Sequence, residues 1–75
     1  MYEQGNGVTK NDKEAVRWFR KSAELGYADA QFKLGLKCDS GKGTEEDHEE
    51  AVRWYRLAAA QGLASAQTEL DAYSD

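Results

Sequence analysis

Apolar residues recur along the chain at helical spacing, in four successive stretches. In the first stretch, apolar residues stand four positions apart at Ala15, Phe19 and Ala23. The third stretch has the same spacing at Ala51, Tyr55 and Ala59. Residues three or four positions apart share one face of an α-helix. The pattern predicts an all-α fold with helices over 12–25, 28–40, 48–61 and 64–73. Each helix must bury its apolar face against a neighbour, so we expect a core of Val16, Phe19, Ala23, Ala30, Leu34, Ala51, Tyr55, Ala59, Ala66 and Leu70.

Helix boundaries are marked by capping residues and glycines. Asn11 has Glu14 three positions later, and Asp47 has Glu50 in the same relation. This is the capping-box arrangement, which satisfies free N–H groups at the start of a helix. Gly26 stands where the first predicted helix should stop, in the left-handed conformation that glycine tolerates. We therefore expect helices to begin directly after Asn11 and Asp47.

The chain repeats itself with a period of 36 residues. When 1–39 are compared with 37–75, 15 of 39 pairs are identical, among them Trp18 with Trp54 and Gly26 with Gly62. Self-similarity at such a period is typical of helical solenoids. Each period holds two amphipathic helices. We expect one domain over 1–75, made of a truncated first repeat at 1–26, a full helix pair at 27–62 and a closing helix at 63–75.

The repeated residues resemble the Sel-1-like repeat, a relative of the tetratricopeptide repeats. The first copy of the motif reads Gly5, Gly7, Val8, Asn11, Ala15, Trp18, Phe19, Ala23, Gly26, Ala28, Ala30, Gln31, Leu34 and Gly35. The second copy reads Gly41, Gly43, Asp47, Ala51, Trp54, Tyr55, Ala59, Gly62, Ala64, Ala66, Gln67 and Leu70. The resemblance implies antiparallel helix pairs stacked into a right-handed superhelix that binds proteins or peptides without catalysis.

Two departures from the motif concern the ends of the array. Asp71 replaces the glycine seen at Gly35, which suits a last and exposed helix. Tyr2 matches the end of a first helix whose body is absent. The helix that follows therefore lacks a preceding partner, and we expect Trp18 or Val16 to be less covered than their counterparts in the second copy. Two interpretations stay open, a homodimer through this N-terminal end and a fragment of a longer array.

Charge and composition exclude several classes of function. Ten Lys and Arg against 14 Asp and Glu give a net charge of −4, the opposite sign to that of a duplex nucleic-acid binder. The sequence contains no run of 18 apolar residues that would predict a membrane span. The first residues form neither a basic segment nor an apolar run, so we expect a cytoplasmic protein without a signal peptide. The single cysteine, Cys38, excludes an intramolecular disulfide.

Candidate chemistry is sparse. The acidic run at 45–50 contains His48 and could be read as a metal site, but a charged loop at a helix N-terminus is the better interpretation. Cys38 lies on the apolar face and is expected to be a small buried hydrophobe rather than a nucleophile. Trp18 and Trp54 are expected to pack between helices. The sequence thus predicts no enzyme, no metal site and no cofactor.

A candidate binding surface lies on the second predicted helix. Residues at spacings of three, four and three form one row outside its apolar face, namely Asp29, Phe32, Leu36 and Asp39. Phe32 and Leu36 have no identical counterparts in the second copy, where Thr68 and Ala72 stand. The row predicts a groove that takes an apolar side chain and a nearby Lys or Arg of a protein partner. In the alternative interpretation, both apolar residues only fill space against the last helix.

Overall fold

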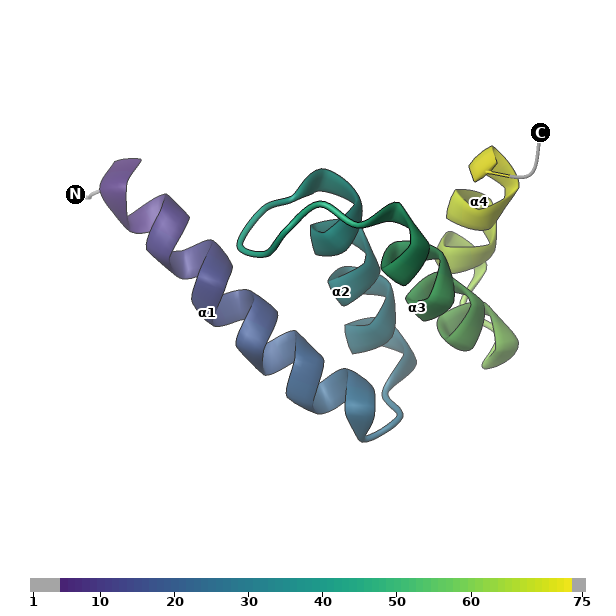
Figure 1. Cartoon of the computed structure of the whole chain (residues 1–75). Helices are drawn as coiled ribbons and strands as arrows, with labels where there is room; N and C mark the ends of the chain where they lie inside the picture. Colours follow the sequence, from purple (N-terminus) through teal and green to yellow (C-terminus); the bar gives the residue numbers. More distant parts are fainter. Residues whose placement is uncertain (1–4, 74–75) are drawn as a thin grey trace.

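The computed structural model describes the backbone of residues 5–73 and the side chains of residues 11–73. Four α-helices follow one another in this part of the chain: α1 (Gly5–Glu24), α2 (Ala28–Ser40), α3 (His48–Ala60) and α4 (Ala64–Tyr73). Each helix packs against the next one, so the four stand in a row (Figure 1). The predicted all-α helical repeat is confirmed. Tyr2, assigned above to a preceding helix, lies outside the described residues.

Glycines with positive φ shape the turns between the helices. Gly26 follows α1 with a φ of 102°, and Gly62 follows α3 with a φ of 96°. Gly41 ends α2 in the left-handed conformation, and its amide donates to the carbonyl of Lys37. The start of α3 confirms its predicted cap, because the Asp47 carboxylate accepts the amide of Glu50 at 3.1 Å. These turns let each helix reverse direction against its neighbour.

The predicted start of the first helix is wrong. Helix α1 begins at Gly5, so Asn11 lies inside it rather than at its cap. In the second repeat, Gly41 and Gly43 adopt positive φ, and the amide of Asp47 donates to the carbonyl of Cys38 at 2.8 Å. That bond ties the loop to the end of the preceding helix. Tyr2, which matches Cys38 in the first copy, lies outside the described residues, and α1 continues through Asn11.

The core runs along the row of helices. Among the side chains of residues 11–73, nine hydrophobic ones are buried, namely Val16, Ala23, Ala30, Leu34, Cys38, Ala51, Tyr55, Ala58 and Ala66. Most of the predicted core is confirmed, although Phe19, Ala59 and Leu70 are only half-buried at its edge. Gln31 is buried as well, and its amide nitrogen donates to the carbonyl of Ala23 at 3.2 Å. None of the helices in the described part is long and apolar enough to cross a membrane.

At the N-terminal end of the row of helices, the side chain of Trp18 is exposed and that of Val16 is buried. Trp18 is 65% exposed, whereas Trp54 is half-buried, which confirms the expectation for the first tryptophan. The prediction that Trp18 packs between helices is therefore wrong. Val16 belongs to the buried core, while Val52 is only half-buried in a groove between α3 and α4, so the valines show the opposite order. Each end of the row thus leaves part of a helix face open.

Candidate partner-binding groove

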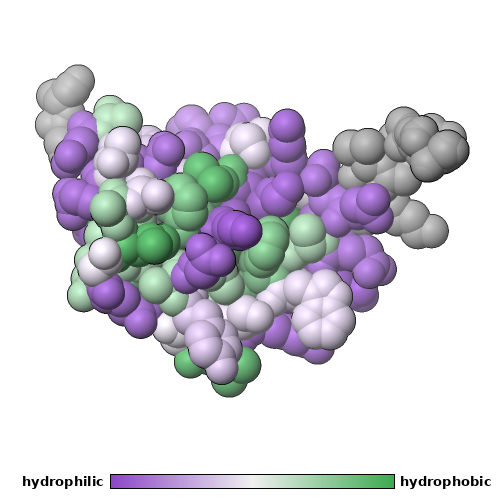
Figure 2. Space-filling view, turned by 180° about the vertical axis from the view of Figure 1, so that it is seen from behind, coloured by the Kyte–Doolittle hydropathy of each residue, from purple (hydrophilic) through white to green (hydrophobic). Residues whose placement is uncertain are grey.

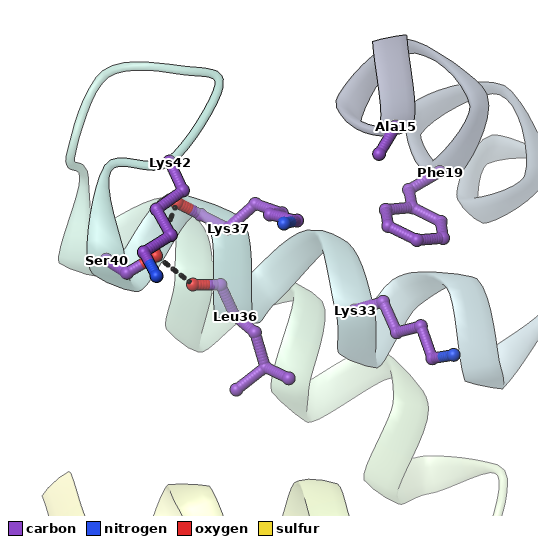
Figure 3. A pocket seen from close by; sticks show the side chains of 7 residues that line it. All are labelled: Ala15, Phe19, Lys33, Leu36, Lys37, Ser40 and Lys42. Atoms are coloured by element: carbon purple, nitrogen blue, oxygen red, sulfur yellow. Dashed lines mark hydrogen bonds between the residues drawn. The ribbon is translucent and has the colours of Figure 1, made fainter. Parts of the chain in front are cut away.

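A groove of about 490 Å³ opens between α1 and α2. Its lining comes from both helices and from the loop that follows α2: Ala15, Phe19, Lys33, Leu36, Lys37, Ser40 and Lys42 (Figure 3). The side chains of Ala15 and Phe19 project from α1 toward α2. Leu36 supplies a second apolar surface, and lysines surround it. On the face seen from behind, hydrophobic residues lie in patches, with hydrophilic residues between and around them (Figure 2).

Local sequence explains how these residues meet. Ala15 and Phe19 are one helical turn apart, so both face α2. Lys33 and Leu36 follow the same rule on α2. The loop is held against α1 at Gly43, where an added Cβ would lie 2.4 Å from the carbonyl oxygen of Asp12. Only a residue without a side chain allows this approach, which places Lys42 at the edge of the groove.

The rim of the groove is basic. It holds three of the six lysines in a chain whose net charge is −4. Lys37 fastens α2 to α1 through an ion pair with Asp12, with 3.0 Å between Nζ and Oδ1. Lys33 is half exposed, with Nζ 6.0 Å from the centre of the Phe19 ring and 4.0 Å from a carboxylate oxygen of Asp29. The lysine charges therefore exceed the carboxylates that meet them.

The four residues of the predicted binding row divide into two groups. Asp29 is exposed, and Leu36 is 37% exposed in the lining of the groove. Phe32 is half-buried, with its ring centre 6.0 Å from that of Tyr55. Asp39 is half-buried too, and accepts hydrogen bonds from the hydroxyls of Tyr55 and Tyr73. The structure thus brings Phe32 and Asp39 to α3 and α4 and leaves Asp29 and Leu36 open.

The groove contains residues that the sequence interpretation missed. Phe19 was assigned to the core, and Ala15 was treated only as part of a helical stripe. The lysines at 33, 37 and 42 were not connected with a site. A signal was present, because Lys33 and Lys37 are one turn apart and Lys42 follows within five residues. Their meeting with the α1 residues depends on helix packing, which spacing alone does not give.

Glu50 forms the main polar link across the core. Its Oε2 accepts from the guanidinium of Arg20 at 3.0 Å and from the indole of Trp54 at 3.1 Å. The hydrogen bond from Trp54 is the largest cause that lowers the pKa of this carboxyl, and Arg20 lowers it further. Arg20 thus joins α1 to α3 through this carboxylate. The contact is structural.

The two other candidates for chemistry, Cys38 and His48, lie in surroundings that do not favour catalysis or metal binding. Cys38 is fully buried, and burial is the main cause that raises the pKa of its thiol to about 11. A thiol with such a pKa is not a thiolate nucleophile at neutral pH. His48 Nε2 lies 2.9 Å from Glu46 Oε2 and 3.4 Å from Asp39 Oδ1. Within residues 11–73, no group of three His, Cys, Asp or Glu side chains could hold a metal ion.

Comparison with family models identifies the repeats. The model described as Sel1 repeat matches residues 1–27 and 28–63, which together make up most of the chain. The chain belongs to the Sel1 repeat family. The comparison with curated proteins found no match.

Solved structures with Sel1 repeats agree with this assignment. A Sel1 repeat protein from Oxalobacter formigenes is 45% identical over 77% of the chain, with a TM-score of 0.76. A protective antigen of uropathogenic Escherichia coli strains, which displays this repeat fold, is 50% identical over 77% of the chain, with a TM-score of 0.77. The chain spans 24% of the first structure and 12% of the second. Both of these chains are thus several times longer than the chain described here.

The second Sel1 repeat shows what covers the matching junction between α3 and α4. Thirty-six residues after Ala15 and Phe19 stand Ala51 and Tyr55, and both are fully buried. Helix α2 lies on them and also reaches Tyr73 of α4 through Asp39. On the junction of α1 with α2, no helix among residues 5–73 takes the corresponding place. Phe19 and Ala15 are half-buried there, and the groove is open.

Proposed function

We propose that this Sel1 repeat chain is a non-catalytic binding module that holds a segment of another protein in the groove between α1 and α2. The observation that carries the proposal is the open apolar floor with its lysine rim. Equivalent floor residues in the next repeat are fully covered, so the surface is suited to receive a further element. Apolar burial provides the main driving force for such contacts. Neither catalysis nor a cofactor is part of the proposal.

The charge of the rim defines the partner. Lys33 and Lys42 are exposed, and Lys37 forms an ion pair with Asp12. Complementary potentials favour and steer association, and they weaken with salt. The segment should therefore combine apolar side chains with carboxylates. The predicted row of Asp29, Phe32, Leu36 and Asp39 suggested a basic partner instead. Leu36 belongs to both proposed surfaces. The lysines beside it favour an acidic partner.

A selection from a random helical peptide library tests this proposal. Peptides that bind the purified chain should be acidic and amphipathic. The double variant Lys33→Glu and Lys42→Glu replaces two attractive charges on the rim with repulsive ones. It should reduce the affinity of these peptides by about tenfold or more, which corresponds to a loss of ~1.4 kcal/mol or more in binding free energy. The matched control is Lys13→Glu with Lys21→Glu, which makes the same charge change outside the groove. Binders that lose affinity equally with both double variants would contradict the proposal.

Self-association is the second candidate function. The open junction at α1 could accept the same face of another copy and give a homodimer. Two copies meeting groove to groove would bring their lysine rims together, and like charges at close range oppose this contact. Sedimentation across a roughly hundredfold dilution separates the two functions, because dimers dissociate by mass action. A dimer that persists at high dilution would favour self-association.

A further inference from the structure

We infer that the α1–α2 groove selects a helix bearing an aromatic residue, a glycine three positions later and a carboxylate four positions after the glycine, and that Asp71 keeps α4 of a second copy out of the groove. The inference rests on the proposed function and narrows its partner. Its basis is that the molecule contains an occupied copy of the same junction. The occupant there is α2, and its contacts define what fits.

Three residues of α2 make the occupied contact. The ring of Phe32 lies 6.0 Å from that of Tyr55, centre to centre. Asp39 accepts hydrogen bonds from the hydroxyls of Tyr55, at 3.4 Å, and of Tyr73. Gly35 lies between them in sequence and is buried. The pattern of the docked helix is thus aromatic at 32, glycine at 35 and carboxylate at 39.

Glycine is required at the centre of this pattern because the Tyr55 ring leaves no room for a side chain. A Cβ added at Gly35 would lie 2.6 and 2.8 Å from two carbons of the Tyr55 ring and 3.3 Å from the carbonyl oxygen of Ala51. Ordinary van der Waals contact begins at 3.4 Å. The ring has little room to move, because Tyr55 is fully buried, with the rings of Phe32 on α2 and Tyr73 on α4 beside it. Close approach of the helix axes therefore depends on the missing side chain.

The open groove presents the same floor thirty-six residues earlier. Ala15 and Phe19 take the places of Ala51 and Tyr55, and Lys37 takes that of Tyr73. A helix seated as α2 is seated would put its glycine over Phe19 and its carboxylate near Lys37. Lys37 already holds Asp12, and Lys42 at the same end of the groove adds a further cation. The exchange of a tyrosine hydroxyl for lysines strengthens the preference for a carboxylate.

Helix α4 carries the wrong residues for this seat. Thr68 stands where α2 has Phe32, and Asp71 stands where α2 has Gly35. Asp71 is exposed, and its Oδ1 accepts from the side-chain amide of Gln67 at 3.0 Å. Seating α4 of one copy in the groove of another would press this side chain onto the Phe19 ring and strip water from a carboxylate. Burying a charge in this way is strongly unfavourable. Asp71 thus disfavours head-to-tail stacking of copies.

Turning α4 into a match for the groove tests the inference. The double variant Thr68→Phe and Asp71→Gly gives α4 the aromatic and glycine of α2, and the sequence already has Asp75 at the position of Asp39. A head-to-tail contact does not close on itself, so copies should add indefinitely. We expect the sedimentation mass to rise with concentration beyond that of a dimer, while the unchanged chain stays monomeric over the same range.

Two further variants define the contact. Thr68→Phe with Asp71→Ala has the same charge and differs by one methyl group, so it should remain monomeric. Adding Ala15→Leu to the associating variant fills the groove floor and should abolish association. Circular dichroism checks that each protein is helical. Association of the alanine variant as strong as that of the glycine variant would overturn the glycine requirement. A folded glycine variant that stays monomeric would overturn the inference.

A peptide experiment keeps the test independent of how the variants fold. The probe is a fluorescent peptide with the sequence of residues 27–41, added to the unchanged chain and followed by anisotropy. A peptide of this length is only marginally helical, so weak binding is expected. The same peptide with Gly35→Ala should bind at least about tenfold more weakly, and equal binding would overturn the inference. Groove-dependent binders of another pattern in the library selection would leave the proposed function standing.

Discussion

Replacing Gly35 with alanine should destabilise the fold, although alanine is the better helix former. The new Cβ would lie 2.6 and 2.8 Å from carbons of the Tyr55 ring, well inside ordinary contact. Forcing an extra carbon into a packed core costs ~1–3 kcal/mol. Alanine in place of glycine inside a helix returns about 1 kcal/mol. The expected net loss in the free energy of unfolding is therefore up to about 2 kcal/mol, which is a large part of the stability of so small a domain.

Thermal and urea unfolding, followed by circular dichroism at the helix band, measures this loss. For a domain of this size each kcal/mol lowers the melting temperature by ~4–8 °C. The control is a double-mutant cycle with Tyr55→Leu, which removes the ring carbons that the new methyl would meet. In that background Gly35→Ala should be neutral or stabilising. The reasoning fails if the single variant melts above the unchanged chain, or if its cost is the same in both backgrounds.

Two other predictions follow from the core. The pKa of Glu50 is lowered in the folded chain, so its contribution to stability is present above its ordinary value of 4.5 and is lost as the pH falls through the folded value. Glu50→Gln should flatten the loss of stability between neutral and acid pH, measured by urea unfolding at several pH values; an unchanged pH dependence would contradict the role of this carboxyl. Cys38 is fully buried and its pKa is raised to about 11, so a thiol reagent at mildly alkaline pH should react slowly with the folded chain and rapidly in urea. Rapid reaction of the folded chain would show that the thiol is accessible.

The sequence by itself determined the repeat, the helices and most of the core. A 36-residue period with paired capping residues and glycines leaves few alternatives to a row of helices, because each apolar stripe must be covered. The ends of α2 and α4 were predicted to the residue, and Leu34, Tyr55 and Cys38 are buried as expected. These features follow from local spacing and turn chemistry, which short stretches of sequence contain in full.

Only the tertiary structure decided which repeated positions are covered and which are open. Phe19 and Tyr55 occupy matching places, yet Tyr55 is fully buried beneath α2, whereas no helix among residues 5–73 takes the corresponding place over Phe19. Asn11 and Asp47 match as well, but Asp47 caps α3 with its amide bonded to the end of α2, whereas Asn11 lies inside α1. The lysine rim arises because α1, α2 and the loop at Gly43 converge. A repeated sequence specifies similar faces, and the helices packed around each face decide whether it becomes core or stays open to solvent.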